Sequence, residues 1–350
     1  MITILIFILI LGILVLVHEW GHFIVAKKSG LTVEEFGFGF PPRIFSRKIK
    51  GTLYSINLLP LGGFVKILGE DGSEAGNQNS FASKSISVKS LITVAGVAMN
   101  FILGALLLIF GFYIGLPQAL NDENESTAKN VQIQIVAISN NSPAEAAGLK
   151  LGDSIMNFRE ISDLQGFINE NKGKEISLEV NRGKEIISVK LTPRLNPPAS
   201  EGAIGVALVK TGIVSYPWYQ SIWLGVKSAF VAVWEIIKGF IGLIKNLLVA
   251  HEVPKEVSGP IGIAVLTKQA ANLGFVYLLQ LVALISLNLA VLNLIPFPAL
   301  DGGRLLFLGI EKLKGSKVNP KIENMVHSVG IVLLLALVAL ITYRDILKLL

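Results

Sequence analysis

The stretch Val17-His18-Glu19-Trp20-Gly21-His22 decides how the rest of the sequence is interpreted. It has the pattern H-E-x-x-H, with two histidines four residues apart and a glutamate directly after the first. In a helix, positions i and i+4 lie on one face, so both imidazoles can reach a single zinc ion. Glu19 lies one position further round the helix, where its carboxylate can act as a general base without binding the metal.

An apolar run leads directly into this motif, because residues 2–17 contain no charged side chain. A secretory signal peptide is the alternative, but it needs a basic start and a small-residue cleavage site. The first basic residue is Lys27, and His18-Glu19-Trp20 stands where cleavage would occur. Residues 1–26 are therefore predicted to be a transmembrane helix that carries a metal site near its end.

The composition indicates a membrane protein with a polar domain. The chain has 350 residues, of which 52% are hydrophobic and only 16% charged. There is no cysteine, which excludes disulfides and cysteine-based zinc sites. The net charge of +6 is modest, and no basic run is interleaved with aromatic residues, so no nucleic-acid partner is expected. These features predict a polytopic α-helical membrane protein.

Four transmembrane helices are predicted, at residues 1–26, 91–117, 271–302 and 325–350. Basic residues follow the first helix and the third, which places both of those ends in the cytoplasm by the positive-inside rule. Asp301, the only acidic residue between Phe275 and Gly303, then reaches the same membrane face as His18 and His22. Residues 303–324 are expected to form a cytoplasmic loop.

Residues 27–90 are predicted to contain β-hairpins followed by a linker. Short alternating runs broken by Gly and Pro at 33–42, 53–58 and 60–67 favour strands, and Glu70–Ser90 is polar and rich in Gly and Ser. The strands are apolar for a loop, so we expect them to dip into the cytoplasmic side of the membrane. A plain cytoplasmic hairpin is the alternative. An edge strand there could pair with an unwound substrate segment.

A polar domain is predicted between the second and third helices, at residues 118–212. The segment Ser142 to Asp153 resembles a PDZ-domain signature, in which a short helix after Ser-Pro leads to a Gly-Asp turn. Strands are expected at 131–138, 176–180, 186–191 and 205–207, giving an extracytoplasmic PDZ-like α+β domain. Such domains bind extended peptides at a sheet edge, although a spacer with an occluded groove is also consistent with the sequence.

Residues 213–270 follow this domain and contain a long apolar helix, Ser221–Ala250. Its three lysines, Lys227, Lys238 and Lys245, fall on one stripe at 100° per residue. We expect an amphipathic helix in the outer interface. A true span is the alternative, but it would carry Asp301 to the wrong side of the membrane.

These features together resemble the site-2 protease family of intramembrane zinc metalloproteases, in its bacterial RseP-like branch. The resemblance rests on His18-Glu19-Trp20-Gly21-His22, on the PDZ-like insert, and on the N-x-x-P-x-P-x-L-D-G pattern that runs from Asn293 to Gly302. It covers essentially the whole chain. Val97 and Arg304 stand where relatives often have Pro and His, and one PDZ-like domain fits where some relatives carry two.

The resemblance implies a function and a set of site residues. His18, His22 and Asp301 would bind one Zn²⁺ ion, and Glu19 would be the general base. Substrate would be held by six residues: Asn288, Asn293, Gly37, Phe38, Gly39 and Tyr54. The reaction would be hydrolysis of a peptide bond within the transmembrane segment of a single-span protein, such as an anti-sigma factor or a remnant signal peptide. The expected location is the bacterial inner (plasma) membrane, with the active site near the cytoplasmic side.

Three alternatives remain at this point. A non-catalytic PDZ-bearing scaffold with a structural zinc would not need Glu19, and a transporter would need inverted repeats that the sequence does not show. His327, near the start of the fourth helix, is a rival to Asp301 as third ligand. Asp301 is favoured because Pro296 and Pro298 end the helix before it and Gly302 and Gly303 follow it. Asn100, in the second helix, is interpreted as a residue that forms a hydrogen bond to a neighbouring helix.

Overall fold

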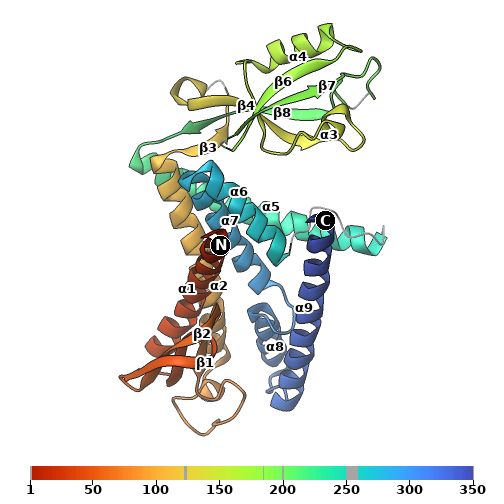
Figure 1. Cartoon of the computed structure of the whole chain (residues 1–350). Helices are drawn as coiled ribbons and strands as arrows, with labels where there is room; N and C mark the ends of the chain where they lie inside the picture. Colours follow the sequence, from red (N-terminus) through yellow and green to blue (C-terminus); the bar gives the residue numbers. More distant parts are fainter. Residues whose placement is uncertain (1, 122–123, 184, 199–200, 250–258, 350) are drawn as a thin grey trace. The chain divides into compact units, whose positions relative to one another are not determined.

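The computed structural model describes residues 2–121, 124–183, 185–198, 201–249 and 259–349 (Figure 1). The chain divides into two compact units, which are described separately. The first comprises residues 1–108, 225–268 and 281–350, and the second comprises residues 109–224 and 269–280. Among the described residues, four helices are long and apolar enough to cross a membrane: Thr3–Lys28, Ile86–Ile114, Phe275–Leu294 and Pro320–Leu347.

The first of these helices, α1 (Ile2–Lys28), carries the H-E-x-x-H motif in its last third and ends at two lysines. It contacts α2 (Ile86–Ile114) at Gly21, where a Cβ atom would lie 2.3 Å from the carbonyl oxygen of Ala95. The glycine therefore lets the two backbones approach closely, as small residues do in membrane helix pairs. The helix α2 begins at Ile86 and not at residue 91, because the polar residues before Leu91 form its first turn.

A single long hairpin follows α1, where the sequence suggested several short ones. Strands β1 (Val33–Ile49) and β2 (Thr52–Ile67) pair antiparallel with several register shifts. Lys50 and Gly51, both at positive φ, join them in a two-residue turn of the primed type that suits the twist of paired strands. The half of the hairpin next to the turn exposes large apolar side chains, at Phe40, Ile44, Phe45, Ile49, Ile56, Leu58 and Leu59. This surface is compatible with the predicted contact with lipid.

The prediction that Glu70–Ser90 forms a linker is wrong in one respect, because part of this segment is buried. Phe81, in the short helix η1 (Phe81–Ser83), packs in a cluster with Phe23, Phe36 and Ile92. This cluster joins α1, α2, the hairpin and the segment between them. A composition rich in Gly and Ser indicated a linker, but one aromatic residue suffices to anchor the segment.

The sequence after residue 274 forms three of the described helices: α7 (Phe275–Leu294), whose first residues belong to the second unit, α8 (Asp301–Lys314) and α9 (Pro320–Leu349). The prediction of a loop over residues 303–324 is therefore wrong for most of its length. The helix α8 was missed because it is short and carries charge, whereas the prediction followed long apolar runs. It ends at Gly315, which adopts the left-handed conformation usual for a residue just beyond a helix.

Two of the described helices, α5 and α6, lie between β8 (Val206–Val214) and α7 in the sequence. The helix α5 (Trp218–Val249) covers the predicted amphipathic segment and is not among the candidate spans of the described residues. Its position in the outer interface stays a prediction. The helix α6 (Pro260–Leu273) was not predicted, and Asp345 of α9 accepts hydrogen bonds from the backbone N–H groups of Gly259 (2.9 Å) and Gly262 (2.8 Å) at its start. Residues 250–258 of the predicted 213–270 segment lie outside the described residues.

The second unit contains a six-stranded sheet in the order β3-β8-β4-β5-β6-β7. Its strands are β3 (Leu116–Ala119), β4 (Lys129–Ile138), β5 (Ser154–Ile155), β6 (Ile176–Arg182), β7 (Glu185–Leu191) and β8 (Val206–Val214). The four strands expected from the sequence are thus present, with β8 longer than predicted. The short helix α3 (Pro143–Ala146) follows Ser142, whose side chain accepts a hydrogen bond from the N–H of Glu145.

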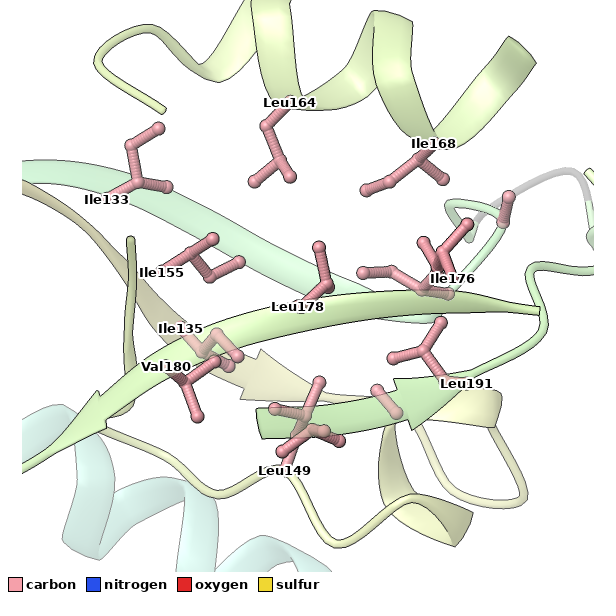
Figure 2. Packing of buried hydrophobic residues seen from close by; sticks show 14 residues of the cluster. Ile133, Ile135, Leu149, Ile155, Leu164, Ile168, Ile176, Leu178, Val180 and Leu191 are labelled. Atoms are coloured by element: carbon pink, nitrogen blue, oxygen red, sulfur yellow. The ribbon is translucent and has the colours of Figure 1, made fainter. Parts of the chain in front are cut away.

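Buried and exposed residues alternate along the strands, and the buried ones form the core of this sheet. Ile176, Leu178 and Val180 of β6 point to one side, where Leu164 and Ile168 of α4 (Ile161–Glu170) cover them (Figure 2). The helix α4 was not predicted. An α+β domain is therefore observed, whereas its assignment as PDZ-like stays a prediction.

One buried ion pair ties β6 to the turn before β5. Asp153 is almost fully buried, and both of its carboxylate oxygens accept hydrogen bonds from the Arg182 guanidinium, at 2.8 and 2.7 Å. Arg182 also donates to the carbonyl oxygen of Gly148 at 2.8 Å. These contacts raise the pKa of Arg182, chiefly through the hydrogen bonds to Asp153.

Replacing Arg182 should destabilise this unit, because it leaves the Asp153 carboxylate buried without its partner. We expect Arg182→Met to cost about 3 kcal/mol, which would raise amide hydrogen exchange in β4 to β7 by roughly a hundredfold. Exchange would be followed by mass spectrometry on the full-length protein. Arg159→Met, at an exposed arginine, is the control, and equal exchange in the two variants would contradict the proposed role of the pair.

Candidate metal centre

Three donor atoms from distant parts of the chain converge in the first unit. The Nε2 atoms of His18 and His22 lie 3.2 Å apart, and Asp301 Oδ2 lies 3.2 Å from the first and 3.4 Å from the second. Asp301 Oδ2 is buried and makes no aligned hydrogen bond to the described residues. His18, His22 and Asp301 form the one group of three or more such side chains found among the described residues that could hold a metal ion.

The spacing of these donors suits zinc. Ligands about 2.0–2.2 Å from a tetrahedral zinc ion lie roughly 3.3 Å from one another, close to the three separations given above. Two imidazoles and one carboxylate also form a common donor set for a catalytic site, which keeps a fourth position open. The residues present therefore fit a zinc ion.

The histidine ring of His22 is oriented by the backbone of α2. Its Nδ1 donates to the carbonyl oxygen of Ile92 at 2.8 Å, because a carbonyl can only accept. Its Nε2 is therefore unprotonated in the neutral ring and can face a metal ion. Gly96 makes room for both rings, since a Cβ atom there would lie 2.3 Å from His22 Nε2 and 2.8 Å from His18 Cε1.

Asp301 reaches the histidines because α7 ends at Leu294 and a tight loop follows. Ala299 in this loop has a φ of +80°, and its backbone N–H donates to Nδ1 of His327 at 3.0 Å. Gly302 and Gly303 are required by sterics, because a Cβ atom at either would lie 2.2 or 2.4 Å from a carbonyl oxygen of the loop. His327 thus contacts the loop that precedes Asp301, and the structure brings Asp301 to His18 and His22.

A second ion pair joins the helix of Asp301 to the segment after the hairpin. The Arg304 guanidinium binds the Glu70 carboxylate and lies 5.2 Å from the centre of the Phe81 ring.

The donors open onto a cavity of about 600 Å³. Glu19 lies on its wall beside the two histidines, and no hydrogen bond from its carboxylate to another described residue is found. Facing it are Phe40 of β1 and the segment Gly62–Val65 of β2. A Cβ atom on Gly63 would lie 3.7 Å from Glu19 Cγ, so the strand passes close to the glutamate.

The structure places some of the predicted substrate residues at the cavity wall and others away from it. Asn293 lines the cavity, whereas the side chain of Asn288 donates to the carbonyl oxygen of Leu284 within its own helix at 3.0 Å. Tyr54 packs against Phe23 and Phe36 and is not among the lining residues.

The Gly37-Phe38-Gly39 segment does not line the cavity either. The ring of Phe38 lies 3.1 Å from where a Cβ atom on Gly12 of α1 would be, and the Gly39 carbonyl accepts from Asn57 at 3.1 Å. Gly39 has a φ of +78°, which explains the glycine. A role in substrate binding for Gly37, Phe38, Gly39, Tyr54 and Asn288 stays a prediction.

Several cavity residues were missed by reasoning from the sequence. Gly62 and Gly63 carried a usable signal, because paired glycines inside a strand often mark a close approach by another group. Glu70 and Arg304 carried none, since a polar segment and a basic loop do not reveal an ion pair between residues so far apart in the chain.

Comparison with known proteins identifies the family of the chain. Residues 6–337 match the family described as Peptidase family M50. A zinc metalloprotease of Nostoc is 35% identical over 94% of this chain and 91% of its own, and one of Clostridium acetobutylicum is 33% identical over 98% and 97%. A protein of Bacillus subtilis named regulator of sigma-W protease RasP is 29% identical over 99% of both chains. The chain therefore belongs to peptidase family M50, the site-2 protease family, and is a zinc-dependent metalloendopeptidase.

Proposed function

We propose that this membrane protease cleaves peptide bonds within the transmembrane segments of single-span proteins, with His18, His22 and Asp301 as zinc ligands and Glu19 as general base. The observation that carries the proposal is the convergence of the three donors beside Glu19, at the wall of one cavity. A zinc ion held there supplies Lewis-acid activation of water and of the scissile carbonyl. A scaffold with a structural zinc would have no use for a free carboxylate in that position.

The remaining steps are proton transfer, binding of the substrate carbonyl and binding of the substrate backbone, and each is assigned to residues of the chain. Glu19 takes a proton from the attacking water and passes it to the leaving amine, which requires a carboxylate free of other partners. The Asn293 amide, on the cavity wall, can donate to the carbonyl oxygen of the substrate. The strand around Gly63 supplies a backbone edge to which an unwound substrate segment can add.

The substrate class and the membrane topology belong to the same proposal. We expect the substrates to be single-span proteins such as anti-sigma factors, or remnant signal peptides. The name of the Bacillus subtilis relative refers to sigma-W. The basic residues after His22 and after Asp301 support a cytoplasmic site in the bacterial inner membrane. The domain at 118–212 would then lie outside the cytoplasm, where a PDZ-like sheet edge could meet the ectodomain of a substrate.

Replacing Glu19 tests the role of the general base. Glu19→Gln should reduce cleavage of a model single-span substrate by about a thousandfold and leave zinc bound, because the glutamate is not a ligand. Cleavage and metal content would be measured on the same purified sample. Glu74→Gln, at an exposed loop residue, is the matched control. Retained activity, or loss of zinc, would refute the assignment.

The third ligand is tested by comparing Asp301 with His327. Asp301→Ala removes one of three donors, so it should lower zinc content sharply and abolish cleavage. His327→Ala should retain zinc, because its Nδ1 contacts the backbone of Ala299 and not the metal site. Metal analysis of both purified variants checks this, and the opposite pattern would show that His327 is the ligand.

The topology can be tested in intact cells, since the native chain has no cysteine to react. Cysteines placed singly at Ser46 and Ser316 should be shielded from a thiol reagent that does not cross membranes. A cysteine at Asn171 should react. If Ser316→Cys were labelled from outside, α5 would have to cross the membrane and the cytoplasmic location of the site would be wrong.

A further inference from the structure

One face of α2 lies against both histidines of the metal centre. Ile92, Gly96 and Asn100 are spaced four residues apart, so they form a single stripe on that helix. The Ile92 carbonyl holds His22, and Gly96 makes room for both rings. Asn100 is fully buried, and its side-chain amide lies 3.4 Å from Nδ1 of His18. The stripe therefore supplies one partner for each imidazole.

The chemistry of zinc binding decides which end of this amide must face His18. A neutral imidazole that binds a metal through Nε2 carries its proton on Nδ1, so the group opposite Nδ1 has to accept. In an asparagine only Oδ1 can accept. The structure has the amide nitrogen near His18 and leaves Oδ1 without a partner among the described residues. Turning the amide over about the Cβ–Cγ bond gives Oδ1 the Nδ1 proton to accept.

We propose that Asn100 is a positioning residue of the zinc centre, which accepts the Nδ1 proton of His18 through Oδ1 and so directs Nε2 of that ring to the metal. This inference rests on the ligand set proposed above. It assigns to Asn100 more than the helix-to-helix contact expected from the sequence. That contact is also present, but it uses the backbone, since the Ser286 hydroxyl donates to the Asn100 carbonyl at 2.7 Å.

Zinc affinity, measured by competition with a chelator on the full-length protein, tests the proposal apart from activity. Asn100→Leu keeps the approximate shape and removes the acceptor, so affinity should fall by about 10- to 100-fold. Asn100→Asp keeps an acceptor and should bind zinc at least as tightly as the native protein. Ser286→Ala removes the neighbouring hydrogen bond without touching His18, and its affinity should change by less than about threefold.

The outcomes separate this proposal from the one on which it rests. Native zinc affinity in Asp301→Asn would overturn the ligand set, and the role of Asn100 with it. Loss of zinc in Asp301→Asn with native affinity in Asn100→Leu would overturn only the role of Asn100. Equal losses in Asn100→Leu and Asn100→Asp would also overturn it, because they would show that an acceptor at position 100 does not preserve zinc binding.

A spectroscopic measurement covers the case in which Asn100→Leu does not fold. With Co²⁺ in place of zinc, the visible absorption reports how strongly the histidines donate to the metal. A carboxylate at position 100 should strengthen donation by His18 and shift these bands in Asn100→Asp relative to the native protein. Identical spectra would overturn the proposal.

Discussion

The structure depends on one constraint, which is that α1, a helix apolar enough to enter a membrane, carries the imidazoles of His18 and His22. Ionisable groups in such a setting cost several kcal/mol unless they are paired or bind a metal. His18 and His22 meet this requirement with Asp301, and α2 provides a carbonyl and an amide on their other sides. The glycines at 21 and 96 follow from the same need, because α2 can serve the histidines only at close range.

The loop before Asp301 shows how the third donor is held. Its backbone would not position a carboxylate unaided, since Ala299 adopts a positive φ that a residue other than glycine rarely takes. The close packing of Gly302 and Gly303 against the loop carbonyls holds that conformation. The Arg304–Glu70 pair then fixes the first turn of α8 to the segment after the hairpin.

Much of this arrangement could be predicted from the sequence, because long apolar runs and the H-E-x-x-H spacing are local signals. The four apolar helices and most strands of the sheet were identified in that way, and His18 and His22 were singled out as predicted ligands. Asp301 was added as a prediction from the family resemblance and from the Pro and Gly residues around it. The helices α6 and α8 were missed since they are short and of mixed polarity. The buried Phe81 and the position of Asn100 beside His18 depend on which helices meet, and no local pattern contains that information. The close pairing of β1 with β2 at Gly37 and Gly39 illustrates the same limit, since it depends on contacts with Phe64 and with the Leu59 carbonyl.

The distance along the chain between the donors has a consequence for synthesis. The two histidines leave the ribosome long before Asp301, because several helices and the whole sheet of the second unit lie between them in the sequence. A stalled or truncated product that ends before Asp301 has two of the three donors and lacks the loop that would bring in the third. With the ligand set proposed here, the nascent enzyme stays inactive towards other membrane helices until Asp301 and the loop before it have been made.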